Sequence, residues 1–342
     1  MSRGNTLGLT DVPGTIVRKL ASYLLGGNGV AGRNEAPVKS LGKIIRSVQA
    51  FGRGLSGLSG QEQTHPSGIG LALGGGFARG IAHIGVLKVL EEENIPISLV
   101  AGTSVGALIG AAYCSGVTIA ELEQMATRVR FKDFARWTLS RYGFASNQRM
   151  IKFLSSILRV KTFEELLIPL AVTATDFSTG AGVVFHSGPL VDPVRASCAY
   201  PGMFLPVQIR GRLLVDGMLA YAVPTIPLRE MGAQKVLAVH LKGTWTNGDA
   251  GPRHLFDVIG QCFAIAQEMN CGVWKAAADL VIDPNVTGFK YDDFERSSEL
   301  IRSGETAMRA ALPEVRKWLH QAEPNRQSQP AHAIQPASAP AK

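Results

Sequence analysis

The sequence has few cysteines, and those it has do not form a binding pattern. Only four of the 342 residues are cysteine. Cys114, Cys198, Cys262 and Cys271 include no CxxC pair, and no histidine stands beside them at the spacing of a zinc site. A chain of this length can build a core without disulfides, so we expect buried, reduced thiols. The sequence predicts neither a metal site nor any other cofactor.

Long apolar runs are also missing. No stretch of about 20 uninterrupted apolar residues occurs, and no basic start followed by a continuous apolar segment precedes the rest. A cytoplasmic protein is therefore expected, with peripheral contact at a membrane as the alternative. The charged fraction of 18% and the aromatic fraction of 7% argue against broad disorder and against a surface for stacking nucleic-acid bases. The apolar fraction of 46% is enough for a large α/β core.

Most of the net charge of +8 lies near the N-terminus. Residues 1–68 hold eight Lys or Arg against three acidic residues, which leaves +5 there and +3 in the rest of the chain. Residues 38–51 place apolar residues at helical spacing with basic residues off that face, which is typical of a helix at a membrane surface and equally of one packed on the main domain. No recognition motif accompanies the basic residues, so no nucleic-acid partner is predicted.

Composition divides the chain into three parts. The basic arm and a Gly/Ser-rich linker make up residues 1–68. Residues 323–342 are rich in Pro, Ala, Gln and Ser, which is the composition of a disordered tail. The folded domain is therefore expected over residues 69–322.

The first informative pattern is a short apolar run, residues 69–73, that ends in Gly74, Gly75 and Gly76. Residues 80–93 follow with apolar residues at helical spacing. A strand, a glycine loop and a helix together are typical of a site for a negatively charged oxygen, because glycine amides can converge there without a crowding Cβ.

Two nucleotide-binding interpretations of this loop fail on spacing. A GxGxxG fingerprint counted from the first glycine requires glycine where Arg79 stands, and a P-loop requires Lys and then Ser or Thr where Ile81 follows Gly80. An oxyanion hole and a plain structural turn remain as alternatives.

The second pattern is a GxSxG sequence centred on Ser104, with Gly102 and Gly106 on its two sides. It lies between an apolar strand at 99–102 and a helical stretch at 107–114, which is the context of a nucleophile elbow. The sharp turn exposes the serine hydroxyl, and the N-terminus of the helix favours developing negative charge.

A third element delivers a carboxylate at the end of a strand. Residues 213–215 are apolar, and Asp216 and Gly217 follow. An Asp-Gly pair after a strand is usually only a turn, so this element carries weight only in combination with the other two.

In combination, the sequence resembles the patatin-like phospholipase family over roughly residues 69–310. The matching segments are 74–81, 102–106 and 216–217, with weaker matches at 174–176 and at 195–207. Met218 departs from the pattern, in which Gly or Ala commonly stands at that position.

The resemblance implies a hydrolase of lipid acyl esters, of the phospholipase A or lysophospholipase type. It implies a dyad of Ser104 as nucleophile and Asp216 as base, without a catalytic histidine. The oxyanion would be bound by the amides of Gly75 and Gly76, while Gly74 shapes the turn and Arg79 either orients the loop or is solvated. Gly80, Gly102, Gly106 and Gly217 support these motifs.

Two other functions stay open. Ser104, Asp216 and then His240 or His254 also follow the chain order of an α/β-hydrolase triad, which would make the protein a carboxylesterase or thioesterase. A non-catalytic lipid-binding scaffold on the same fold is the second alternative. His83 lies one turn into the helix after the glycine loop, where a packing role or support of its neighbours is expected.

The expected fold is a three-layer α/β sandwich with a mostly parallel central sheet. Its later strands are predicted at 168–173, 213–215, 236–240 and 280–282. Residues 131–159 mix aromatic, basic and apolar residues, so they form either a cover over an acyl-chain pocket or ordinary helices packed on the sheet.

Overall fold

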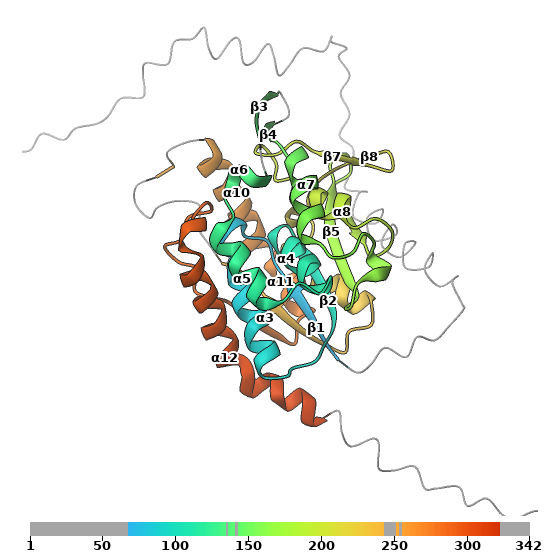
Figure 1. The fold of residues 1–342 in the computed structure, drawn as a ribbon, viewed down its shortest axis with the longest axis vertical. Helices are drawn as coiled ribbons and strands as arrows, with labels where there is room; N and C mark the ends of the chain where they lie inside the picture. The colour runs from blue at the N-terminus through green and yellow to red at the C-terminus, as the bar shows by residue number, and fades with distance from the viewer. Residues whose placement is uncertain (1–67, 135, 141–142, 243–250, 253–254, 322–342) are drawn as a thin grey trace, which may run out of the picture. The chain divides into compact units, whose positions relative to one another are not determined.

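The computed structural model describes residues 68–134, 136–140, 143–242, 251–252 and 255–321 (Figure 1). The N-terminal arm, most of its linker and the C-terminal tail lie outside the described residues, so the expectations for these segments stay predictions. The strands are β1 Ile69–Leu73, β2 Ile97–Thr103, β3 Arg136–Ser140, β4 Gly143–Ser146, β5 Leu170–Asp176, β6 Gly182–Phe185, β7 Val207–Ile209, β8 Arg212–Asp216, β9 Lys235–Val239 and β10 Leu280–Ile282.

The helices alternate with these strands along most of the chain. The α-helices are α3 Ala82–Glu92, α4 Val105–Cys114, α5 Ile119–Arg128, α6 Phe131–Phe134, α7 Gln148–Ile157, α8 Val191–Ser197, α9 Thr225–Glu230, α10 Leu255–Met269, α11 Cys271–Ala276 and α12 Ser297–Gln321. Short 3-10 helices are η2 Phe77–Ile81, η3 Phe163–Glu165, η4 Gly217–Leu219 and η6 Phe294–Arg296.

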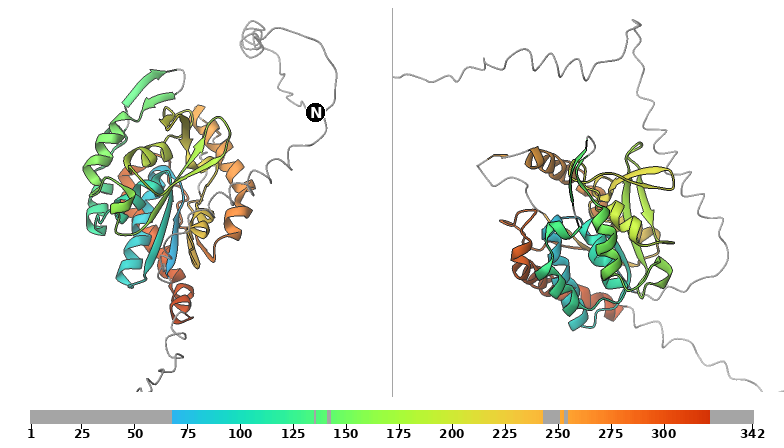
Figure 2. Two further views of the ribbon diagram at one scale, coloured as in Figure 1. Left: turned by 90° about the vertical axis from the view of Figure 1, so that its right-hand side faces the viewer. Right: turned by 45° about the horizontal axis from the view of Figure 1, so that its top comes forward.

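Helices cover both faces of one central sheet, as the views in Figure 2 show. Alternate residues of each strand point to opposite faces, so Leu71 and Leu73 belong to one hydrophobic core and Ala72 to the other. The first core contains side chains of α3, α4, α5 and α12, and the second contains side chains of α9 and α11. The expected three-layer α/β fold is confirmed.

The central sheet has the strand order β10-β9-β1-β2-β5-β8-β7, and β6 also pairs with β5. The pairs from β10 to β5 are parallel, as expected, whereas β6, β7 and β8 pair antiparallel. The predicted strand at 213–215 therefore runs against the strands that surround it. The predicted strand at 280–282 matches β10 in both bounds, and the other predicted strands differ from the observed ones by a few residues at their ends.

Two strands meet end to end along β5. Strand β2 pairs with β5 up to Thr103 opposite Thr173, and β8 pairs with β5 from Asp216 opposite Ala174. Strand β6 overlaps both stretches of β5, so β2 and β8 must share the other edge. Because they run in opposite directions, the carboxyl end of β2 faces the carboxyl end of β8 across one residue step of about 3.3 Å.

Two buried glycines, one on each helix, allow α12 to pack closely on α3. A Cβ placed on Gly85 would lie 1.9 Å from the Ile301 carbonyl oxygen, and one placed on Gly304 would lie 1.9 Å from the Ala82 carbonyl oxygen. Any larger residue at either position would push the helices apart. Helix α12 therefore packs directly on the helix that follows the glycine loop.

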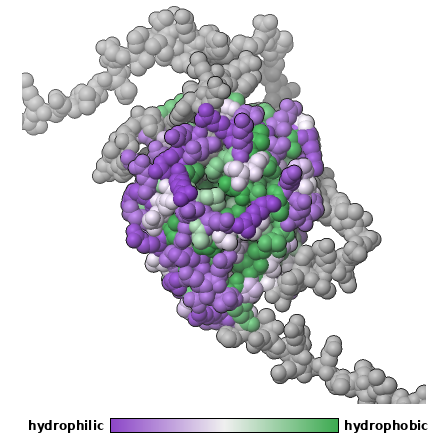
Figure 3. Space-filling model, viewed as in Figure 1, coloured by the Kyte–Doolittle hydropathy of each residue, from purple (hydrophilic) through white to green (hydrophobic). Residues whose placement is uncertain are grey.

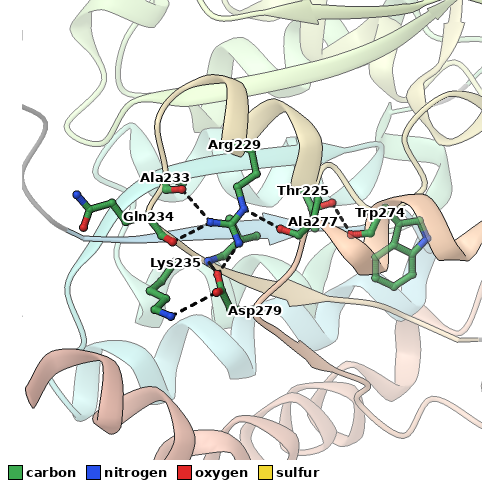
Figure 4. A network of polar contacts seen from close by, with 9 residues as sticks. Thr225, Arg229, Ala233, Gln234, Lys235, Trp274, Ala277 and Asp279 are labelled. Carbon is green, nitrogen blue, oxygen red and sulfur yellow. Dashed lines mark hydrogen bonds and ion pairs between the residues drawn. The ribbon is translucent and has the colours of Figure 1, made fainter. Parts of the chain in front are cut away.

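Arg229 ties the helices of the second layer to the sheet (Figure 4). Its guanidinium donates to the carbonyl oxygens of Ala277 at 2.9 Å, Ala233 at 3.1 Å and Gln234 at 2.8 Å. It also donates to the Asp279 carboxylate at 2.6 Å. One side chain thus holds the end of α9, the start of β9 and the start of β10 in place.

The thiols differ from the expectation in one respect. All four cysteines are free, and Cys114 and Cys198 are buried, but Cys262 is exposed and Cys271 is half-buried. Cys262 lies in α10, whose outer face is apolar, so its hydrophobic neighbours in the sequence do not indicate burial.

Among the described residues, no helix is both long and apolar enough to cross a membrane.

Candidate active site

Ser104 occupies a sharp turn between β2 and α4. Its backbone has φ 56 and ψ −124, a left-handed φ that is uncommon for a residue other than glycine. The turn depends on the glycines around it. A Cβ on Gly102 would lie 2.5 Å from the Ala107 Cα, and one on Gly106 would lie 2.2 Å from the Leu73 carbonyl oxygen. The local geometry is that of a nucleophile elbow.

Buried hydroxyl groups hold this turn in place. The Ser104 amide donates to the hydroxyl oxygen of Ser197 at 2.8 Å, at the end of α8. The neighbouring Thr103 hydroxyl donates to the Tyr221 carbonyl at 2.8 Å and lies 2.7 Å from the Thr173 hydroxyl. The strained backbone is thus fixed by contacts from three other parts of the chain.

The Ser104 hydroxyl donates directly to the Asp216 carboxylate, with 2.7 Å between Oγ and Oδ2. The other carboxylate oxygen accepts the Met218 amide at 2.9 Å, and the Thr175 hydroxyl donates to the Asp216 carbonyl at 2.9 Å. Asp216 is fully buried and Ser104 is 7% exposed. The two side chains meet because β2 and β8 end face to face on β5.

Burial dominates the electrostatics of Asp216. The loss of solvent raises the pKa of its carboxyl to about 7, while the Met218 amide and the Ser104 hydroxyl act in the opposite direction by stabilising the charged form. A carboxylate with an ordinary pKa is a weak base. One that is half-protonated near neutral pH matches the requirement for a general base at that pH.

The amides of the glycine loop are not equivalent. Gly75 lies beside the nucleophile, since a Cβ placed on it would lie 3.5 Å from the Ser104 Cβ. Its amide, however, donates to the Ala222 carbonyl at 3.3 Å, and the Gly74 amide donates to the Val239 carbonyl at 3.1 Å. The Gly76 amide has no hydrogen-bond partner among the described residues. Of the two amides expected to bind an oxyanion, Gly76 is open and Gly75 is engaged.

An apolar cavity of about 120 Å³ begins at Ser104 and follows one side of α4. Figure 3 shows hydrophobic side chains gathered on this face of the molecule, over α4 and α7. Helix α7, from the segment proposed to cover an acyl-chain pocket, forms one wall. The side chains of α4, α5 and α7 that line the cavity are Val105, Leu108, Ile109, Ala112, Leu122, Met125, Ala126, Met150, Phe153 and Ile157.

Comparison with known proteins decides the family. Residues 71–229, which include the glycine loop, the elbow and Asp216, match the family model of the patatin-like phospholipases. These residues therefore form a patatin-like phospholipase domain.

Relatives of this patatin-like domain occur in bacteria, fungi and animals. An uncharacterised NTE family protein of Mycobacterium tuberculosis is 35% identical over 187 residues, which cover 54% of this chain and 51% of that protein. Lysophospholipase NTE1 of Mycosarcoma maydis is 28% identical over 72% of this chain and 14% of its own length. Patatin-like phospholipase domain-containing protein 6 of Mus musculus is 38% identical over 50% of this chain and 13% of its own length. The chain thus spans about half the length of the mycobacterial relative and a small part of the other two.

A solved structure supports the fold alone. VipD from Legionella pneumophila matches with a TM-score of 0.50 at 13% identity, over 73% of this chain and 67% of that chain.

Two side chains that follow the glycine loop, Arg79 in η2 and His83 in α3, support the loop of the patatin-like domain. Arg79 is 3% exposed, so the solvated alternative does not apply, and its Nε donates to the Gly76 carbonyl at 3.4 Å. His83 is fully buried, and its Nε2 donates to the Gly74 carbonyl at 2.8 Å. Burial lowers the pKa of His83 to about 4, so the ring is neutral near pH 7. The remaining motif glycines allow close packing: a Cβ on Gly80 would lie 2.2 Å from Val105, and one on Gly217 would lie 2.5 Å from Thr173.

The histidines of the rival triad do not complete it in the described part of the patatin-like domain. His240 follows β9, and its Nδ1 lies 2.7 Å from the Asp283 carboxylate. Its ring packs 5.1 Å from that of Trp274. His254 lies outside the described residues. No described histidine is hydrogen-bonded to Ser104 or Asp216.

Ser197 and Thr175 touch the patatin-like site but had no predicted role. Both lie within the weaker family matches at 195–207 and 174–176, which is the only sequence signal that could have identified them. Their contacts are to backbone groups of Ser104 and Asp216, so their role depends on a fold that brings distant segments together.

Proposed function

We propose that this chain is a serine hydrolase that cleaves carboxylic esters of lipids, of the phospholipase A or lysophospholipase type. The observation that carries this proposal is the 2.7 Å contact between Ser104 and a fully buried Asp216 at the start of an apolar cavity. The family supports a lipid ester as substrate, and one relative is named a lysophospholipase.

Acylation uses the hydrogen bond that already exists. The Ser104 Oγ attacks the ester carbonyl carbon while its proton moves to Asp216 Oδ2. Negative charge then develops on the carbonyl oxygen, where the open Gly76 amide and the N-terminus of α4 favour it. When the tetrahedral intermediate collapses, the carbon–oxygen bond to the alcohol breaks. The alcohol leaves with the proton from Asp216, and the acyl group stays on Ser104.

Deacylation repeats the same proton transfer with water. Water attacks the acyl carbonyl carbon and gives its proton to Asp216, and the bond to Ser104 breaks as the proton returns to Oγ. A carboxylic acid is released, and the dyad returns to its starting state. No second base is required, because one carboxylate accepts and returns the proton in each half of the reaction.

The length and the apolar lining of the cavity favour an ester with a long acyl chain over an ester of a small acid. Its wall on α4 extends from Ser104 to Ala112, which is a distance of about 12 Å at the rise of an α-helix. The walls are almost wholly apolar, so each methylene group that enters them loses contact with water favourably. The ester carbonyl would stay at Ser104 while the chain lies along α4.

The first test is ester hydrolysis by dyad variants. Ser104→Ala and Asp216→Asn should each lower kcat by roughly 10² to 10⁴ on p-nitrophenyl butyrate and on a fluorogenic phospholipid. The matched control is the double change His240→Ala and His254→Ala, which should keep activity. Loss of activity in a folded double variant would establish the triad instead.

A fluorophosphonate probe separates an enzyme from a scaffold. The wild-type protein should be labelled at Ser104, and Ser104→Ala should not be labelled. A wild-type protein that is inert toward every ester and remains unlabelled would replace the hydrolase with the non-catalytic lipid-binding scaffold.

A further inference from the structure

Helix α10 is apolar on two opposite faces. Leu255, Val258, Ile265 and Met269 are exposed at 60%, 44%, 50% and 82%, and Cys262 between them is exposed as well. At 100° per residue these positions fall within about 80° of arc, so they form one stripe along the helix. We call these five residues the α10 stripe. Val273, at the next turn in α11, extends it and is 67% exposed.

The inner face of α10 packs on the active site. Phe263 contacts Tyr200 with 5.6 Å between ring centroids, and Tyr200 contacts Phe77 at 4.8 Å. Phe77 and Phe204 line the cavity at Ser104, and both belong to the hydrophobic cluster on which α10 rests. Helix α10 is therefore linked to the lining of the substrate cavity through the ring contacts of Phe263, Tyr200 and Phe77.

The stripe stands out from the rest of the described surface. Most of the large apolar side chains that are exposed there lie on α10 and α11. No exposed charged residue interrupts α10 between the buried Asp257 and Glu268. A helix with a buried apolar face normally presents polar residues on the other side, so a second apolar face indicates a second apolar partner.

We propose that the α10 stripe docks the domain on the surface of a lipid bilayer, and this inference rests on the proposed lipid hydrolase function. The stripe is about 21 Å long and narrow, so it offers a few hundred Å², less than the roughly 800 Å² that each partner buries in a standard protein interface. An interfacial helix needs only such a stripe, because the acyl region accepts apolar side chains from one side.

One cationic side chain borders the stripe. Lys242 pairs with Glu268 of α10 at 3.3 Å and remains 68% exposed. Its ammonium group can meet a lipid phosphate while the stripe enters the acyl layer. Docking would then bring the aromatic cluster above Ser104 to the surface that supplies the substrate.

Vesicle binding tests the docking surface without hydrolysis. The full chain with Ser104→Ala and Cys271→Ser carries an environment-sensitive fluorophore on Cys262 and is mixed with phosphatidylcholine vesicles at high salt, which screens attraction by the basic arm. The fluorophore should enter an apolar environment. Met269→Asp should weaken vesicle binding by roughly tenfold or more.

Leu167→Asp is the matched control. Leu167 is 76% exposed but precedes β5, so it lies at the amino end of the strand, whereas Ser104 lies at the carboxyl end of β2. Its change should therefore leave vesicle binding unaltered. Equal weakening by both changes would overturn the proposal. A fluorophore that stays in water while the chain binds vesicles would also overturn the proposal. A fluorophore whose environment changes with protein concentration alone would overturn it too, because that result would indicate a second copy on the stripe.

Hydrolysis of a water-soluble ester keeps the two proposals apart. Met269→Asp with an intact Ser104 should hydrolyse p-nitrophenyl butyrate at the wild-type rate and lose activity only on vesicles. Vesicle docking without any esterase activity would refute the hydrolase alone, and esterase activity without docking through α10 would refute this inference alone.

Discussion

The change Asp216→Asn should make the protein more stable as it makes it inactive. Asparagine has the size of aspartate, and its amide can accept the Met218 N–H and donate to the Ser104 hydroxyl, so both contacts of the carboxylate are retained in altered form. What is removed is the charge that burial disfavours.

The size of the effect follows from the pKa of Asp216. Burial raises it from 3.8 to about 7, and at 1.36 kcal/mol for each pKa unit the ionised side chain costs the native state roughly 4 kcal/mol. The native state keeps a proton that the unfolded chain releases from about pH 4 upward, so wild-type stability falls as pH rises to about 7 and stays low above it. Asp216→Asn should lack this loss.

Urea unfolding across the pH range measures this difference. The free energy of unfolding of Asp216→Asn should be close to that of the wild type near pH 4 and exceed it by up to roughly 4 kcal/mol above pH 8. The control Ser104→Ala is also expected to be inactive but keeps the carboxyl, so its stability should fall with rising pH as much as that of the wild type or more. A difference between Asp216→Asn and wild type that does not change with pH would refute the reasoning.

Three further predictions concern the supports of the site. Arg229→Leu should lower the free energy of unfolding in urea by about 3 kcal/mol, because three carbonyls and Asp279 lose their donor. Fluorophosphonate labelling of the folded fraction should stay unchanged, and an unaltered free energy of unfolding would contradict this prediction. His83→Leu should lower kcat by about tenfold by leaving the Gly74 carbonyl without its donor, and His83→Gln should restore part of it; equal rates for the two variants would argue against a role of this bond. Ala112→Phe should fill the far end of the cavity and slow hydrolysis of long p-nitrophenyl esters but not of the butyrate, and the opposite order of effects would exclude this route for the acyl chain.

Local sequence patterns predicted the parts of the site that are local. The apolar run before the glycines, the GxSxG turn and the helix after it are each set by a few neighbouring residues, and the structure has β1, β2 and α4 where the pattern placed them. The atoms that leave no room for a Cβ at 102 and 106 likewise lie only a few residues away or on the adjacent strand.

Most of the site contacts that the sequence did not reveal are long-range. The direction of β8 depends on its pairing with β5, and the engaged amide of Gly75 depends on Ala222, which is far along the chain. Ser197 holds the Ser104 amide across 93 residues, and apart from the weak family match at 195–207 a single serine in a helix carries no signal for that contact. The exposure of Cys262 could not be predicted for a related reason, since helical spacing alone does not say which apolar face of α10 turns inward.

The close contact between α3 and α12 bears on how the protein is made. The glycine loop leads into α3, and this side of α3 is covered when Gly304 and Ile301 of α12 pack against Ala82 and Gly85. Among the described elements α12 is the last along the chain, so Ser104 and Asp216 are synthesised before the helix that packs on α3. A nascent chain without α12 would therefore already carry both dyad residues but would leave Gly85 and Ala82 of α3 uncovered.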